Sequence, residues 1–434
     1  MESPGALTEE IRKAKQWHAQ GDYPQAMALY HEILATDSTH AEAKHFLGIA
    51  LHQMKEAEKA NALMRESLEL QPDNVEWWNN YGNVLTEQKK LQEAEIAFTR
   101  VLALTPEDEM AWHNLGTVFQ LQGLHDKAEE AYREALTINP RSIAGLKLMG
   151  NLLRQKNRLL EAAQLHAEAV TLDPNSRKNP LELARAWVTL NRVDKAAEVY
   201  AQWHRDEPDN PTAIFLQAAC TGENVPESCS QAYVETTFDA YASTFDSVQK
   251  QLSYRGAEML EKILAEIDLP RPPLDILDLG CGTGMCAPYL SPLARTLTGV
   301  DLSQKMLDRA AEGNAYTQLI KADILDYLNA HPAGFDLLTS AECFIYFGNL
   351  QKVFPAIVQA LRPGGVCIFT IERLDDPEAC YKLHEVGRYC HTQEYVMSLV
   401  VQNELEVIKI DPGILRMEMC LPVEGFIWAI RKRS

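Results

Sequence analysis

The sequence lacks any apolar run that approaches the roughly 18–20 residues needed to cross a bilayer. Its first residues, MESPGALTEEIRKAK, also lack the apolar core of a secretory signal. The nine cysteines include no CxxC pair, which disfavours both a disulfide framework and a zinc site. These absences predict a cytoplasmic protein in reducing surroundings, with no membrane partner and no metal.

Positive charge is also scarce. The chain has 41 Lys and Arg against 61 Asp and Glu, a net charge of -20, and both halves share the acidic excess. Binding to nucleic acid releases counterions from the phosphates and needs a basic surface on the protein. We therefore expect no nucleic-acid partner, and we attribute the excess acid to solubility.

At 434 residues the chain is too long for one hydrophobic core, and its first half has an internal period of 34 residues. Proline and alanine both recur with this period, at Pro72, Pro106, Pro140, Pro174 and Pro208 and at Ala26, Ala60, Ala94, Ala128, Ala162 and Ala196. We predict six repeats, 7–40, 41–74, 75–108, 109–142, 143–176 and 177–210, followed by a closing helix near 211–220. The predicted domain is an all-α solenoid over residues 7–220.

The repeat at 109–142 matches a known repeat consensus most completely. It contains Trp112, Leu115, Gly116, Tyr132 and Pro140 at positions that resemble the tetratricopeptide repeat (TPR) consensus. In that family, small residues let two antiparallel helices touch, and the proline ends the second helix. The first helices of TPR arrays line a groove that binds peptides, so the resemblance implies a peptide or protein partner.

Three asparagines are candidate substrate-binding residues of that groove. Asn80 and Asn114 hold the same position in the third and fourth repeats, and Asn83 lies one turn further along the third. An amide has both a donor and an acceptor, so such residues can pair with a peptide backbone without selecting its side chains. Alternatively, they are polar consensus residues of a stable repeat.

A short polar linker, TGENVPESCS over 221–230, separates this region from a second domain at 231–434. In the second domain, short runs rich in Leu, Ile, Val and Thr alternate with helical stretches. This alternation predicts an α/β Rossmann-like domain, in which helices cover both faces of a parallel sheet. The clearest predicted strands are residues 274–279, 294–300, 335–339 and 366–371.

Acidic residues and a glycine-rich turn follow successive strands of this domain. The first strand ends in Asp278-Leu279-Gly280-Cys281-Gly282-Thr283-Gly284, a turn that alone is a weak signal. Asp301 ends the next strand, where its carboxylate can accept hydrogen bonds from two ribose hydroxyls, and Asp323 lies further on at the height of an adenine amino group. A dinucleotide pyrophosphate would not suit the Asp278 carboxylate, whereas a ligand with an ammonium and a sulfonium would.

This order of motifs resembles the class I S-adenosylmethionine (SAM) methyltransferases. The lead-in FDAYASTFD, residues 238–246, further resembles a bacterial family of TPR-fused methyltransferases related to trans-aconitate methyltransferases. The resemblance implies an enzyme with SAM as its cofactor and a lead-in that folds over SAM, with Tyr241 at its methionine end. The implied cofactor-binding residues are Tyr241, Asp278, Gly280, Cys281, Gly282, Gly284, Asp301, Leu302, Asp323 and Ile324.

Methyl transfer requires alignment of the reacting atoms and removal of one proton from the acceptor. Glu342, where relatives are expected to have Asp, follows the fourth strand and could bind the amino group of SAM, act as the base or cap a helix. His391 lies in a polar, aromatic segment expected to cover the site, as a base, a substrate-binding group or a surface histidine. Tyr346 and Tyr389 are expected to form walls of the substrate pocket.

The sequence favours an oxygen as the methyl acceptor. It has neither the Asn/Asp-Pro-Pro-Tyr/Phe element used for planar nitrogens nor the paired glutamates used for arginine. We predict a SAM-dependent methyltransferase whose TPR groove recruits a peptide, protein or carrier-bound substrate for O-methylation. The alternatives are a small-molecule O-methyltransferase whose repeats serve only assembly, and a catalytically inactive interaction scaffold.

Overall fold

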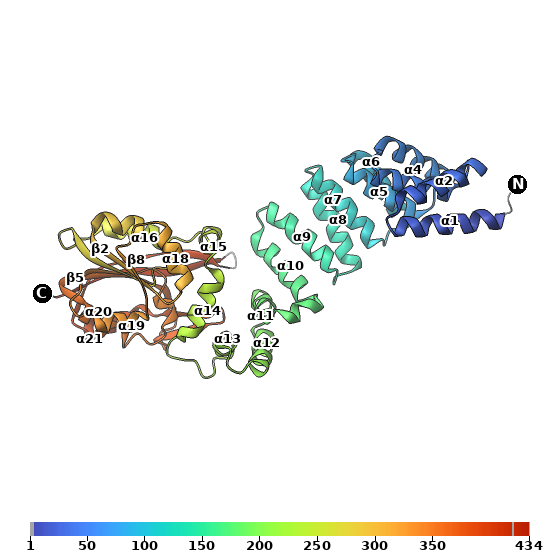
Figure 1. Cartoon of the computed structure of the whole chain (residues 1–434). Helices are drawn as coiled ribbons and strands as arrows, with labels where there is room; N and C mark the ends of the chain where they lie inside the picture. The colour runs from blue at the N-terminus through green and yellow to red at the C-terminus, as the bar shows by residue number, and fades with distance from the viewer. Residues whose placement is uncertain (1–3, 419–420, 434) are drawn as a thin grey trace. The chain divides into compact units, whose positions relative to one another are not determined.

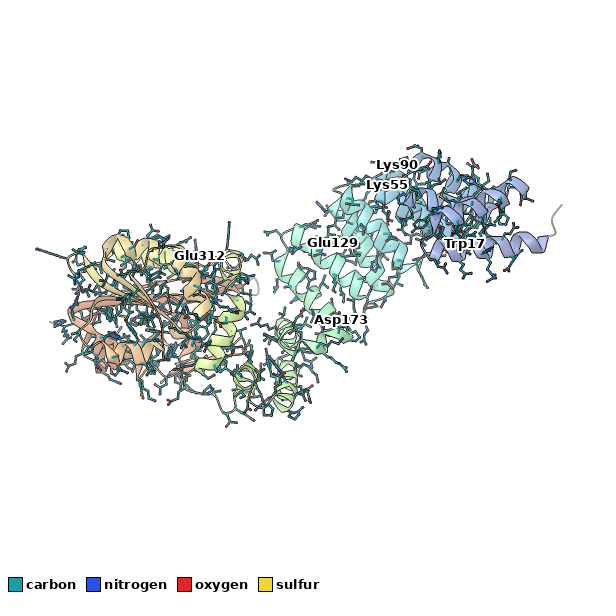
Figure 2. All side chains as sticks on the ribbon, viewed as in Figure 1. Trp17, Lys55, Lys90, Glu129, Asp173 and Glu312 are labelled. Atoms are coloured by element: carbon teal, nitrogen blue, oxygen red, sulfur yellow. The ribbon has the colours of Figure 1, made fainter. Side chains whose placement is uncertain are left out.

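The computed structural model of the chain describes residues 4–418 and 421–433. The backbone forms two compact units, Met1–Asp173 and Pro174–Ser434. Figure 2 labels Asp173, the last residue of the first unit.

The first unit consists of helices that pack as consecutive antiparallel pairs (Figure 1). The pairs are α1 (Pro4–Ala19) with α2 (Tyr23–Thr36), α3 (Ala41–Gln53) with α4 (Ala57–Leu70), α5 (Val75–Glu87) with α6 (Leu91–Leu104), α7 (Glu109–Leu121) with α8 (His125–Ile138), and α9 (Ile143–Gln155) with α10 (Leu159–Leu172). Each pair lies within one predicted repeat, except that α1 begins at Pro4, before the predicted start of the first repeat at residue 7.

Small residues bring the two helices of a pair into contact. A Cβ atom on Gly82 would lie 2.7 Å from the Phe98 ring, and one on Gly116 would lie 2.5 Å from the Tyr132 ring. Both rings are fully buried, so they have no room to move away. The repeat glycines therefore permit the close packing that the TPR resemblance implies.

Local hydrogen bonds end one repeat and begin the next. The indole Nε1 of Trp78 donates to the carbonyl of Pro72 at 2.8 Å, and Trp112 donates to Pro106 at 3.0 Å. Asp108 begins α7 by accepting from the backbone N–H of Ala111 at 2.9 Å. The side chains that recur in the sequence thus hold the turn between neighbouring repeats.

The second unit begins with helices of the predicted sixth repeat, α11 (Pro180–Thr189) and α12 (Val193–Asp206), and the closing helix α13 (Pro211–Thr221). Residues of these helices share one hydrophobic cluster with residues of the α/β region, among them Tyr200, Leu216, Tyr233 and Tyr389. The boundary between the compact units therefore falls after Asp173, and it does not coincide with the predicted linker at 221–230.

A nine-stranded sheet forms the centre of the second unit, in the order β3-β2-β1-β4-β5-β7-β6, with β9 pairing β5 and β8. Strands β1 to β5 pair in parallel as predicted, whereas β9 is antiparallel to β5 and β8, and β6 is antiparallel to β7. The strands are β1 (Leu274–Leu279), β2 (Ala294–Asp301), β3 (Gln318–Lys321), β4 (Phe335–Ser340), β5 (Leu361–Arg373), β6 (Tyr381–His384), β7 (Arg388–His391), β8 (Leu405–Glu418) and β9 (Leu421–Lys432).

Helices cover both faces of this sheet, with α16 and α18 along one face and α19, α20 and α21 along the other (Figure 1). The helices of this region are α14 (Gln231–Tyr241), α15 (Phe245–Gln251), α16 (Gly256–Glu266), α17 (Ala287–Leu290), α18 (Gln304–Glu312), α19 (Ile324–Ala330), α20 (Val353–Ala360) and α21 (Gln393–Gln402). The predicted fold class, a TPR solenoid followed by an α/β Rossmann-like domain, is confirmed.

Candidate active site

A cavity of about 760 Å³ lies at the carboxyl ends of the parallel strands, where open α/β sheets bind their ligands. This volume is within the range of about 300–1,000 Å³ that is usual for small-molecule sites. The cavity is lined by most of the residues that the sequence predicts for cofactor binding, namely Tyr241, Asp278, Gly280, Cys281, Gly282, Asp301, Leu302, Asp323 and Ile324.

The glycine-rich turn after β1 has backbone angles that favour glycine. Gly280 and Gly282 have φ values of +65° and +54°. A Cβ atom on Gly280 would lie 2.8 Å from Cys343, whereas one on Gly282 would have only the Phe245 ring near it, at 3.9 Å. Gly284 does not line the cavity, because it packs against Tyr316 instead. Its predicted place at the cofactor site is therefore corrected.

Asp301, at the end of β2, holds the glycine-rich turn in place through hydrogen bonds to its backbone. Its Oδ2 accepts from the backbone N–H of Gly282 at 3.0 Å, and its Oδ1 accepts from that of Ser303 at 2.8 Å. Burial raises the pKa of Asp301, although these N–H groups oppose the rise. The turn and the buried carboxylate are thus one preorganised structure.

Two further predicted carboxylates line the cavity. Asp278 is 2% exposed and accepts hydrogen bonds from the Tyr316 hydroxyl at 2.7 Å and the Thr339 hydroxyl at 2.9 Å. Burial raises the pKa of Asp278 to about 6. Asp323 caps α19, where its Oδ1 accepts from the backbone N–H of Leu325 at 2.8 Å. The backbone N–H of Asp326 donates to the same oxygen at 3.2 Å, so both cap bonds of Asp323 use Oδ1.

The lead-in helices contact the rim of the cavity. Asp239 of α14 accepts a hydrogen bond from the hydroxyl of Ser303, and Asp246 of α15 accepts one from the hydroxyl of Thr283 at 2.6 Å. Tyr241, which ends α14, lines the cavity. These bonds hold the lead-in over the glycine-rich turn.

Glu342 lies just beyond β4 with a φ value of +63°, which is uncommon for a residue that is not glycine. Its backbone N–H donates to Thr370 Oγ1 at 2.8 Å, and its Oε2 accepts from the guanidinium of Arg416. Its Oε1 is buried and has no hydrogen-bond partner among the described residues. Neither neighbouring helix is capped by this side chain, so the capping alternative is wrong.

Arg416 is the centre of a buried charge cluster that sequence reasoning missed. Its side chain is 2% exposed and binds Glu342, Glu372 and Glu418, the last at 3.1 Å. Arg388 donates to the same Glu418. Nothing in the sequence shows that residues so far apart meet at one site.

The expected positions of two other residues are corrected. His391 is fully buried on β7 and does not line the cavity; its Nε2 donates to the carbonyl of Gly348 at 3.1 Å. Burial lowers the pKa of His391 to about 4, so the imidazole is neutral at physiological pH. Tyr389 is also fully buried, and its hydroxyl donates to the carbonyl of Pro226 at 2.6 Å. Only Tyr346 of the two predicted tyrosine walls lines the cavity.

The candidate asparagines all lie on first helices of repeats in the first unit. Asn83 is exposed, and Asn80 and Asn114 are half-buried. Asn80 Nδ2 lies 3.2 Å from Nε2 of the buried His45, which also stacks on Trp77. Asn80 therefore has a neighbour within the repeats as well as a surface that a peptide could reach.

The described residues contain neither a metal-binding cluster nor a membrane-crossing helix. No group of three or more His, Cys, Asp or Glu there could hold a metal ion. Among the same residues, no helix combines the length and the apolar character that a membrane crossing requires.

Family models match both halves of the chain. A methyltransferase domain model matches residues 277–369. Tetratricopeptide repeat models match residues 73–141 and, separately, residues 18–79 and 153–220. The chain therefore combines tetratricopeptide repeats with a methyltransferase domain.

Similar proteins include several O-methyltransferases. The chain is 32% identical over 137 residues to a malonyl-(acyl-carrier protein) O-methyltransferase of Pseudescherichia vulneris, which covers 32% of this chain and 52% of that protein. It is 31% identical over 141 residues to a ubiquinone biosynthesis O-methyltransferase of Thiobacillus denitrificans. That match covers 31% of this chain and 56% of that protein. The chain thus spans about half the length of these curated relatives.

Solved structures similar to this chain include a methyltransferase. A SAM-dependent methyltransferase from Mesorhizobium loti matches with a TM-score of 0.34 and 22% identity, over 42% of this chain and all of that chain.

Proposed function

We propose that the chain transfers a methyl group from SAM to an oxygen of an acceptor that the repeats recruit as a peptide, protein or carrier-bound molecule. The observation that carries the proposal is one cavity lined by the glycine-rich turn, Asp301, Asp323 and Glu342. The methyltransferase model and the O-methyltransferase names of the curated relatives support the same reaction class.

The residues of the cavity fit SAM. Gly282 leaves open space where a side chain would otherwise enter the cavity. Asp301 and Asp323 would bind the hydroxyls and the amino group of the adenosine half, because carboxylate oxygens accept such bonds strongly. Among the described residues no Lys, which a phosphate ligand would favour, lines the cavity. The buried Asp278 suits a positively charged ligand. When bound, SAM supplies a methyl group on a positively charged sulfur.

Glu342 is the candidate base. Its Oε1 has no partner among the described residues and can accept the proton of an acceptor hydroxyl, while Arg416 holds Oε2 in place. Burial raises the pKa of Glu342, and the Arg416 guanidinium opposes that rise. His391 offers no comparable atom to the cavity.

We expect Glu342→Gln to lower kcat by about 10²–10⁴-fold, the usual contribution of general base catalysis, because the amide cannot accept the proton. The affinity for SAM should change little if Glu342 is the base, but should fall if Glu342 binds the amino group of SAM. His391→Gln is the matched control, and we expect its kcat to remain within a few-fold of the wild type. Initial rates give kcat, and calorimetric titrations give the affinity for SAM, for the wild type and the two variants. A normal kcat for Glu342→Gln would show that Glu342 is not the base.

Recruitment by the repeats is the second part of the proposal. Exposed and half-buried amides on successive first helices can pair with an extended backbone. The alternative is a small-molecule acceptor with repeats that serve assembly. The two differ in where the transferred methyl group is found.

The test incubates the full chain with methyl-labelled SAM and cell extract and then separates macromolecules from small molecules. We expect label in the macromolecular fraction, and less of it with the Asn80→Ala/Asn114→Ala variant, since each lost side-chain hydrogen bond is worth about 0.5–1.5 kcal/mol. Label only among small molecules would favour the alternative. No label in either fraction, with Asp301→Ala as the background, would indicate an inactive scaffold.

A further inference from the structure

The cavity continues beyond the residues assigned to SAM. Its walls include Val188 of α11, Tyr200 of α12 and Leu216 of α13, which belong to the last repeat helices. Its side along α14 runs from Tyr233 to Tyr241, a distance of about 12 Å at 1.5 Å per residue. We call the part walled by α11, α12, α13 and the first half of α14 the apolar arm.

Four apolar or aromatic side chains of the apolar arm are buried and packed together. Val188, Tyr200, Leu216 and Tyr233 are at most 8% exposed and belong to one packed cluster. A Cβ atom on Gly387 would lie 2.7 Å from Leu216 and 3.0 Å from the Tyr233 hydroxyl, so the neighbouring turn fits against this wall without spare room. A preformed apolar wall of this kind binds an apolar body by removing it from water.

The charged side chains that line the cavity determine which charge a bound acceptor can have. Six carboxylates and three guanidiniums line it, a formal excess of three negative charges. The positive charge of SAM offsets part of this excess and leaves the cavity negative. Arg388 is already paired with Glu418, and Arg416 is paired with three glutamates. Arg185 donates to the uncharged Tyr241 hydroxyl and keeps its positive charge, which the formal count already includes. The net negative charge of the cavity therefore disfavours an anionic acceptor.

We infer that the apolar arm binds the body of an uncharged, largely apolar acceptor that presents a hydroxyl group to Oε1 of Glu342. This inference rests on the proposed function and narrows its acceptor to a neutral phenol or alcohol with an apolar skeleton. The last repeat helices then belong to the substrate site of the methyltransferase domain, in addition to any role in recruitment.

The experiment measures binding to the full chain saturated with S-adenosylhomocysteine, the demethylated form of SAM. Calorimetry compares 2-naphthol with 2-naphthoate, which share the same rings and differ in charge at neutral pH. We expect naphthol to bind at least about tenfold more tightly, because an unpaired anion is disfavoured in a buried site. Equal or tighter binding of naphthoate would overturn the inference.

Variants locate the bound ring. Val188→Phe fills the apolar arm and should weaken naphthol binding about tenfold or more, whereas Val188→Ala enlarges it and should not block binding. Thr189→Phe, at another lining position of α11, is the substitute if Val188→Phe does not fold. Unchanged naphthol binding in the filling variant overturns the inference. S-adenosylhomocysteine binding is titrated in every protein: its absence from the wild type would overturn the proposed function, whereas failure of the naphthol tests alone would leave that function standing.

Discussion

Replacing Asp301 with alanine is expected to weaken SAM binding roughly 30- to 150-fold, which corresponds to about 2–3 kcal/mol. The substitution removes a buried carboxylate that would accept hydrogen bonds from the cofactor. It also releases the backbone N–H groups of Gly282 and Ser303, which Asp301 now holds. The variant therefore loses both a binding partner and the fixed geometry of the glycine-rich turn.

Calorimetric titration of the full chain with SAM measures this effect. Asp301→Asn separates the two losses, because the amide oxygen can still accept a hydrogen bond but has no charge. Asp326→Ala is the matched control, since this aspartate of the same sheet edge is exposed. Wild-type affinity in Asp301→Ala, or binding of a nicotinamide dinucleotide by the wild type, would contradict the cofactor assignment.

Arg416→Leu is expected to lower the free energy of unfolding by about 3–5 kcal/mol at neutral pH, the usual cost of breaking a buried ion pair from one side. The guanidinium binds Glu342, Glu372 and Glu418 in a site where water is largely excluded. Without it, buried carboxylates lose their counter-charge. Arg373→Leu is the control, because its side chain is 43% exposed and its surface ion pairs are worth about 0–1 kcal/mol.

The loss of unfolding free energy in Arg416→Leu should depend on pH. Burial already raises the pKa of Glu342, and removing Arg416 removes a charge that lowers it. A group whose pKa is higher in the folded state than in the unfolded state binds more protons when folded, so stability falls as pH rises. Denaturant unfolding at pH 5.5 and 7.5 should therefore show a larger difference from the wild type at pH 7.5. A difference that is equal at both pH values would contradict this account of the cluster.

The order of motifs predicted much of the cavity, and topology explains why. The residues after successive parallel strands must meet at one edge of the sheet, so Asp278, Asp301, Asp323 and Glu342 could be placed together from their positions in the chain. The expectation that the polar, aromatic segment around His391 covers the site misplaced His391, and Tyr389 was also wrongly expected to line the pocket. Both lie on β7, whose pairing with β5 and β6 buries them, and neither pairing has a signature in the sequence.

The sequence by itself determined the repeats, the order of strands and helices in the second half, and the acidic edge of the cavity. These features are local, or follow from the direction in which parallel strands run, so spacing and residue type specify them. Only the tertiary structure decided that Arg416 meets Glu342 and Glu372, that Gly284 packs away from the cavity, and that α11, α12 and α13 wall its apolar arm. Those contacts join residues far apart in the chain, and their energy comes from burial, which no single segment displays before the elements have packed.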